Sequence, residues 1–197
     1  DGCRRGWFYI GIDENDQYEF GIISEFEEIL PIVEQAIQIL VDIPIGLREN
    51  ESQERLCDLE ARKVLGIRRS SVFIPPSRSA LISNNYSKAS EINFQCTGRR
   101  LSKQSFAISQ KIKEVDNFII STGLQGKFRE MHPEVCFWAL NNYQSMNFNK
   151  KISSGVQERW LILNNCFSNT HKLVEDVRSK YLKKDVANDD ILDALVG

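Results

Sequence analysis

Acidic residues crowd the final segment of this 197-residue sequence, NDDILDALVG, which holds Asp189, Asp190 and Asp193. In a helix, residues three positions apart lie on one face, so Asp190 and Asp193 would project together. Two neighbouring carboxylates repel each other unless a cation separates them, and a hard divalent ion suits oxygen ligands. The spacing therefore indicates a metal site. The alternative is that Asp189 or Asp190 only caps the helix, which leaves Asp193 unexplained.

Two further aspartates stand where strands are expected to end. Asp42 follows a run of apolar residues, and an unpaired carboxylate buried there costs several kcal/mol. It is either a metal ligand or bonded to nearby backbone amides or an arginine. The sequence does not begin with Met, so we expect residues before Asp1; if they form a strand, Asp1 ends it beside Asp42. The alternative for Asp1 is an aspartate turn with Gly2.

The elements that must position these acids follow from hydrophobic period and turn residues. Strands are predicted at 7–13 and 18–23, joined by a hairpin turn at 13–16, then in the apolar run 37–43 as a central strand buried on both faces, and at 127–132. Helices are predicted from the capping-box pair Ser24 and Glu27, and at 53–65, 86–97, 102–118, 133–141, 154–166, 170–181 and from 189 onward.

This order of elements predicts an α/β fold with one mixed sheet flanked by helices. Residues 1–197 form a single domain, and residues 52–122 form a helical, basic insertion after the central strand. Asp42 then lies at the carboxyl end of a buried strand, where α/β proteins keep their ligands.

Positive charge is concentrated in one part of the chain. Residues 61–113 hold eleven basic residues and one acidic residue, Glu91, although the formal net charge of the whole chain is only −2. Such asymmetry indicates a polyanion, which nucleic acid would satisfy. The alternative is a solvated basic face paired with acids elsewhere. The candidate substrate-binding residues are Arg68, Arg69, Ser71, Arg78, Arg99, Arg100, Lys103 and Gln104.

Five stretches together resemble the domain-of-unknown-function 429 family, described as predicted RNase H-like nucleases. They are DGCRRGW, VDIPIGL, RSSVFIPP, REMHPEVCFWALN and DDILDAL, and they run from the first residue almost to the last. The resemblance implies an RNase H-like mixed sheet, with an acid ending the first strand, another ending the central strand, and a pair on a late helix.

The resemblance also implies a chemistry. Asp1, Asp42, Asp190 and Asp193 would bind Mg²⁺ or Mn²⁺, with Glu134 as a fifth acid, for two-metal hydrolysis of phosphodiester bonds. His132 could move protons beside these acids. For Glu134 the alternative is favourable placement at a helix N-terminus, and for His132 it is a structural role.

Other function classes are weighed against this one. No P-loop, G-x-G-x-x-G or G-x-S-x-G motif occurs. A phosphate- or nucleotide-binding protein on the same fold, or a non-catalytic nucleic-acid-binding module, remains the alternative. Five cysteines without a C-x-x-C motif indicate buried thiols of a reducing compartment rather than a disulfide framework. We expect a cytoplasmic protein with no membrane span, acting on DNA or RNA; resolvase-like chemistry would favour a homodimer.

Overall fold

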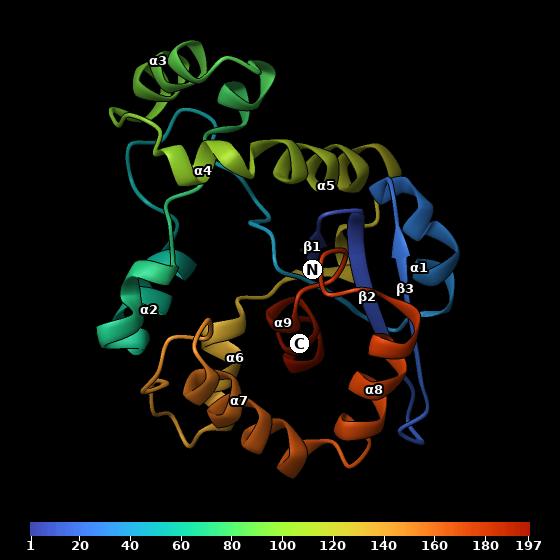
Figure 1. Ribbon diagram of the computed structural model, residues 1–197. Coiled ribbons are helices and arrows are strands. Elements are labelled where there is room, and N and C mark those ends of the chain that lie inside the picture. Colours follow the sequence, from blue (N-terminus) through green and yellow to red (C-terminus); the bar gives the residue numbers. More distant parts are fainter.

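The computed structural model describes residues 1–197 and combines helices with two small sheets (Figure 1). The strands are β1 (Gly2–Cys3), β2 (Gly6–Ile12), β3 (Tyr18–Ile23), β4 (Ile39–Val41) and β5 (Phe128–Glu130). The α-helices are α1 (Leu30–Gln35), α2 (Leu56–Leu65), α3 (Tyr86–Thr97), α4 (Lys103–Ala107), α5 (Ser109–Thr122), α6 (Pro133–Leu140), α7 (Ser153–Cys166), α8 (Thr170–Lys180) and α9 (Asn188–Val196). Four 3-10 helices, η1 to η4, cover Phe26–Ile29, Gly66–Ser71, Arg78–Ile82 and Gln125–Lys127.

The predicted hairpin is confirmed. Strands β2 and β3 pair antiparallel from Trp7 opposite Ile23 to Ile12 opposite Tyr18. The turn is held by Asp13, whose carboxylate accepts hydrogen bonds from the backbone N–H groups of Asn15 and Gln17, at 2.9 and 2.8 Å. Short polar side chains that bond to their own backbone in this way favour tight turns.

The expectation of one mixed sheet is wrong. Strands β1, β2 and β3 form an antiparallel sheet, and β4 and β5 form a separate parallel pair. The apolar run 37–43 is also not a strand buried on both faces, because only Ile39–Val41 is extended and its one neighbour is β5. Ile37 is 96% exposed and Leu40 is 41% exposed, so a continuous apolar run was not sufficient to indicate burial.

Both faces of the hairpin are nevertheless covered, because its side chains alternate between two cores. Trp7 and Ile23 belong to a first core, and Phe8 belongs to a second. The first core is completed by η1, α1, β4, β5 and α5, and the second by α6 to α9. This arrangement places α9 against β2, which brings the last acidic helix next to the first residues (Figure 1).

Each predicted helix is present, but some helix boundaries differ from the prediction. Helix α3 has the predicted bounds, whereas the helix predicted at 102–118 is divided at Ile108 into α4 and α5. The predicted capping box at Ser24 is displaced by one residue. Glu25 is the N-cap residue, and the Glu28 carboxylate accepts a hydrogen bond of 3.1 Å from its N–H.

The segment 52–122 contains helices α2 to α5 and makes up most of the connection between the parallel strands β4 and β5. Parallel neighbours require a long crossover of this kind. Its last helix, α5, is part of the first core, where Ile112 and Val115 are fully buried. The connection is therefore anchored in the body of the molecule.

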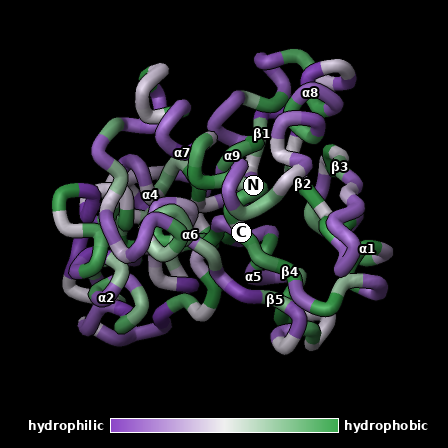
Figure 2. The backbone as a smooth tube through the Cα atoms, turned by 90° about the horizontal axis from the view of Figure 1, so that it is seen from below, coloured by the Kyte–Doolittle hydropathy of each residue, from purple (hydrophilic) through white to green (hydrophobic).

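The chain termini lie side by side in two views at right angles (Figures 1 and 2). None of the helices combines the length and the apolar character needed to cross a bilayer. All five cysteines are free thiols; Cys3 is buried, but Cys57 and Cys166 are exposed, which corrects the expectation that all were buried.

Candidate functional site

Asp1, Asp42 and His132 line one pocket, and the strand register explains why. Val41 lies opposite Glu130 in the parallel pair β4–β5, so Asp42 and His132 emerge from the same edge. This is the edge at which α/β proteins place polar groups for ligands.

Asp1 reaches the pocket through the first sheet. Its amino group donates to the carbonyl oxygen of Phe8, and the Phe8 N–H donates back to the Asp1 carbonyl, each at 2.8 Å. The carboxylates of Asp42, Asp190 and Asp193 lie close enough to the Asp1 backbone nitrogen for charge interactions.

Helix α9 presents Asp190 and Asp193 toward the same region. The Asp190 carboxylate accepts a hydrogen bond of 2.7 Å from the Ala187 N–H, so it also serves as the predicted cap. Asp193 is only 2% exposed and forms an ion pair with the ammonium of Lys150. Burial raises the pKa of Asp193 to about 6, although Lys150 opposes the shift.

No hydrogen bond reaches the Asp42 carboxylate, so neither structural alternative, backbone amides or an arginine, holds it. Burial raises the pKa of Asp42, and nearby His132 and Lys150 oppose this. Asp42, Asp193 and Lys150 thus form one electrostatic unit, which we call the Lys150 group. A carboxylate without a donor at a pocket wall is available to a ligand.

The carboxylate oxygens of the four aspartates suit Mg²⁺ or Mn²⁺ as ligands, but they are not gathered closely around one point. No three of the four aspartates have carboxylate oxygens that all lie within 4.8 Å of one another. The Lys150 ammonium provides positive charge at Asp193 instead. The residues fit a divalent ion in their chemistry, provided that the carboxylates close around it.

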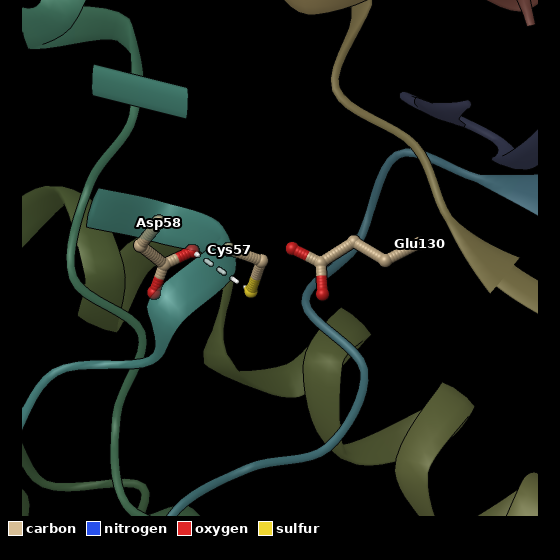
Figure 3. Close-up of side chains that lie close together, drawn as sticks. All are labelled: Cys57, Asp58 and Glu130. Carbon is tan, nitrogen blue, oxygen red and sulfur yellow. Dashed lines mark hydrogen bonds between the residues drawn. The ribbon is translucent and has the colours of Figure 1, made fainter. Parts of the chain in front are cut away.

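Asp58 and Glu130, which also line the pocket, belong to a second acidic cluster. Cys57 and Asp58 on α2 approach Glu130 on β5, and one ligand atom from each lies within 4.8 Å of the others (Figure 3). Arg55 already occupies this cluster, which we call the Arg55 group (Arg55, Asp58, Glu130). The guanidinium donates twice to Asp58, twice to Glu130 and once to the Ile45 carbonyl, at 2.5–2.9 Å.

These five contacts use all five N–H groups of an arginine. The guanidinium therefore supplies the charge that a metal ion would bring, and the Arg55 group does not fit a metal site. Instead, it joins the loop after β4, the start of α2 and the end of β5. Burial acts to lower the pKa of Arg55, but hydrogen bonds and charge from Asp58 and Glu130 raise it above its usual value.

The model of the family described as "Protein of unknown function (DUF429)" matches residues 1–197. The chain belongs to this family. No curated protein and no solved structure matches the chain significantly.

Two other candidates in this DUF429 chain have structural partners. Glu134, 8% exposed, forms an ion pair with Arg159, 1% exposed. His132 stays at the pocket, where its Nε2 atom lies 3.3 Å from the Ser71 carbonyl oxygen and its Nδ1 atom has no partner.

The predicted substrate-binding residues of the DUF429 chain divide into two classes. Arg78 is paired with Asp116 and Glu49, Arg99 with Glu54, and Arg100 with Glu91, while Arg68 donates to the Met146 carbonyl and Ser71 to the Arg68 carbonyl. In contrast, Arg69, Lys103 and Gln104 are exposed and have no ion pair or side-chain hydrogen bond. The alternative of basic residues paired with acids therefore holds for three of the arginines.

The cations nearest the acids were missed by sequence reasoning. Lys111 of α5 lines the pocket, donates a 2.7 Å hydrogen bond to the Gly6 carbonyl and lies 4.2 Å from the centre of the Trp7 ring. Lys150 and Arg55 were missed as well. Lys111 lies in the basic stretch, but nothing in that stretch distinguishes it from the surface lysines.

Proposed function

We propose that this chain is a metal-dependent nuclease with an RNase H-like arrangement, which hydrolyses phosphodiester bonds at the pocket lined by Asp1 and Asp42. The observation that carries the proposal is the Asp42 carboxylate, which is half-buried at the pocket wall and accepts no hydrogen bond from the protein. Asp190 and Asp193 of α9 do not line this pocket, but their charges act on the Asp1 nitrogen, and Asp193 and Asp42 act on each other.

The residues that would hold Mg²⁺ or Mn²⁺ are Asp1, Asp42, Asp190 and Asp193. Such ions lower the pKa of bound water and neutralise developing charge on phosphate oxygens. Asp42 and Asp193 supply negative charge, and His132 supplies an imidazole ring at the same pocket as Asp42 for proton transfer. Lys111, on the same pocket, offers a cation to a phosphate oxygen.

One observation favours the alternative, a non-catalytic protein that binds phosphate, nucleotide or nucleic acid. Lys150 already neutralises Asp193, and Arg55 neutralises Asp58 and Glu130, so two acidic groups carry their own cations. A fully self-neutralised pocket would bind polyanions without hydrolysing them.

The deciding experiment is cleavage of labelled single strands, duplexes, DNA–RNA hybrids and junctions with Mg²⁺ or Mn²⁺, comparing the parent with Asp42→Asn. We expect the variant to lose activity by a factor on the order of 10² or more, since even supporting residues of metal sites cost ~10–100-fold. Asp16→Asn is the matched control, because Asp16 is exposed and its φ of 59° suits asparagine. Binding without cleavage by a folded parent would instead establish the alternative.

A further inference from the structure

Lys150 stands apart from the other lysines because the chain around it is tightly held. The Glu158 carboxylate accepts hydrogen bonds from the backbone N–H groups of Asn147 and Phe148, at 2.8 and 3.1 Å. Arg159 donates to the Phe148 carbonyl at 3.2 Å. These hydrogen bonds from the first turns of α7 therefore fix Asn147 and Phe148, the residues that lead into the turn containing Lys150.

Gly155 of α7 also helps to fix the backbone at Lys150. A Cβ atom at Gly155 would lie 2.0 Å from the Asn149 carbonyl oxygen and 3.2 Å from the Lys150 nitrogen, so only glycine lets the two segments touch. The Asn149 side chain in turn accepts a 2.9 Å hydrogen bond from the Lys151 N–H. The backbone of Lys150 is thus fixed on both sides.

From this fixed backbone the Lys150 side chain reaches the aspartates. Its ammonium forms the ion pair with Asp193, whose side chain is 3% exposed, against 35% for Lys150 itself. Burial acts to lower the pKa of Lys150, but the carboxylates of Asp193, Asp189 and Asp42 raise it. Immobilising a lysine costs side-chain entropy, which a solvated surface lysine avoids.

We propose that the Lys150 ammonium permanently occupies one cation position among the aspartates, so that the site takes one divalent ion fewer with this lysine than without it. This inference rests on the proposed metal site. A divalent ion bound to a carboxylate oxygen lies about 2.0–2.6 Å from it. An ammonium in contact with the same Asp193 oxygen excludes such an ion by volume and by charge.

The consequence is a division of roles. Lys150 neutralises Asp193 with a fixed charge, and Asp1, Asp42 and Asp190 remain to bind the exchangeable ion. The two-metal scheme implied by the family resemblance then becomes a scheme of one ion and one ammonium.

The test is the number of Mn²⁺ ions bound at saturation, counted by the loss of the free-ion paramagnetic resonance signal. We expect Lys150→Met to bind one more ion per chain than the parent. Lys151→Met is the matched control, because Lys151 is exposed and forms no ion pair, and it should bind as many ions as the parent. Lys150→Gln repeats the test with a side chain that still bonds to Asp193, should the methionine variant fold poorly.

Thermal unfolding supplies a readout without any substrate. Removal of Lys150 leaves Asp193 without its cation, so Lys150→Met should melt below the parent in a chelating buffer. An ion in the vacated position stabilises the folded state by mass action. Saturating Mn²⁺ should therefore raise the melting temperature of the variant more than that of the parent.

Equal numbers of bound ions in the parent and in both Lys150 variants would overturn the role of Lys150 and leave the metal site standing. An absence of bound Mn²⁺ in all of these proteins would overturn the metal site itself, and the Lys150 proposal with it.

Discussion

The Arg55 group and the Lys150 group each combine two carboxylates with one cation, and both have members that line the same pocket, yet they are built differently. In the Arg55 group, four of the five N–H groups of the guanidinium bind carboxylate oxygens and the fifth binds a carbonyl. In the Lys150 group, the ammonium contacts only Asp193, and Asp42 accepts no hydrogen bond. The Arg55 group uses every hydrogen-bond donor of its cation and therefore acts as a structural clamp. The Lys150 group leaves the Asp42 carboxylate without a donor, which leaves room for a ligand.

This contrast follows from the two side chains. A guanidinium is planar and presents its donors in a fork that fits carboxylates on two sides, and it keeps its charge at any ordinary pH. An ammonium is a compact point charge on a flexible stem. The Arg55 group therefore fixes α2 relative to β5, and the Lys150 group balances charge at a site that remains open to the pocket.

The largest effect is expected from breaking the clamp. Arg55→Met leaves Asp58 and Glu130 facing each other without a cation, and removal of one partner from a buried ion pair costs about 3–5 kcal/mol. Lys150→Met should cost less, roughly 1–2 kcal/mol, because Asp193 can take up a proton instead. Urea unfolding of both variants at neutral pH measures the difference, and equal costs would contradict the distinction between the two groups.

The next largest effect is expected in the pH dependence of the free energy of unfolding. The carboxyl pKa of Asp193 is raised to about 6 from 3.8, so the folded chain binds this proton more tightly than the unfolded chain does. Its stabilising contribution is complete below about pH 4 and is lost as the pH rises through 6. A shift of this size corresponds to about 3 kcal/mol.

The Asp193→Asn variant has no carboxyl group at this position, so it does not lose this stability as the pH rises through 6. In a chelating buffer, its unfolding free energy relative to the parent should therefore rise by about 2–3 kcal/mol between pH 4 and pH 7. Urea denaturation at several pH values provides the measurement. A difference that does not change with pH would mean that Lys150 holds Asp193 in its charged form as firmly as a clamp would.

The smallest effect is expected on the basic surface. There, cations that are paired with acids can be compared with cations that are not. Arg69→Gln and Lys103→Gln should each lower the slope of log affinity against log salt for a single-stranded oligonucleotide by about 1. Arg100→Gln should change the slope little, because Arg100 is paired with Glu91. Fluorescence anisotropy over a range of salt concentrations distinguishes them; identical slopes for all three variants would remove Arg69 and Lys103 from the nucleic-acid surface.

Local signals predicted much of the fold. The hairpin and α3 follow from alternation, turn residues and a terminal glycine, all of which act within a few positions. The prediction of a helix that carries Asp190 and Asp193 is local in the same way. These predictions succeeded because each depends on neighbouring residues.

Partner choice between distant residues was not predictable. Lys150 meets Asp193 across 43 positions, and Arg55 meets Glu130 across 75. Neither Lys150 nor Arg55 differs in its local sequence from cations on the surface. Similarly, Ile37 is exposed because the three-residue strand β4 begins only at Ile39, and hydrophobicity alone does not reveal that.

The packing of α9 against β2 has a consequence for the order of events during synthesis. The acids of the proposed metal site come from Asp1, from position 42 and from α9, so contacts between segments far apart in the sequence must bring them together. A chain still attached to the ribosome can form the hairpin before α9 emerges, but until then it lacks Asp190 and Asp193. Assembly of the aspartates therefore depends on the docking of α9 onto β2, and any activity they support would report that this contact has formed.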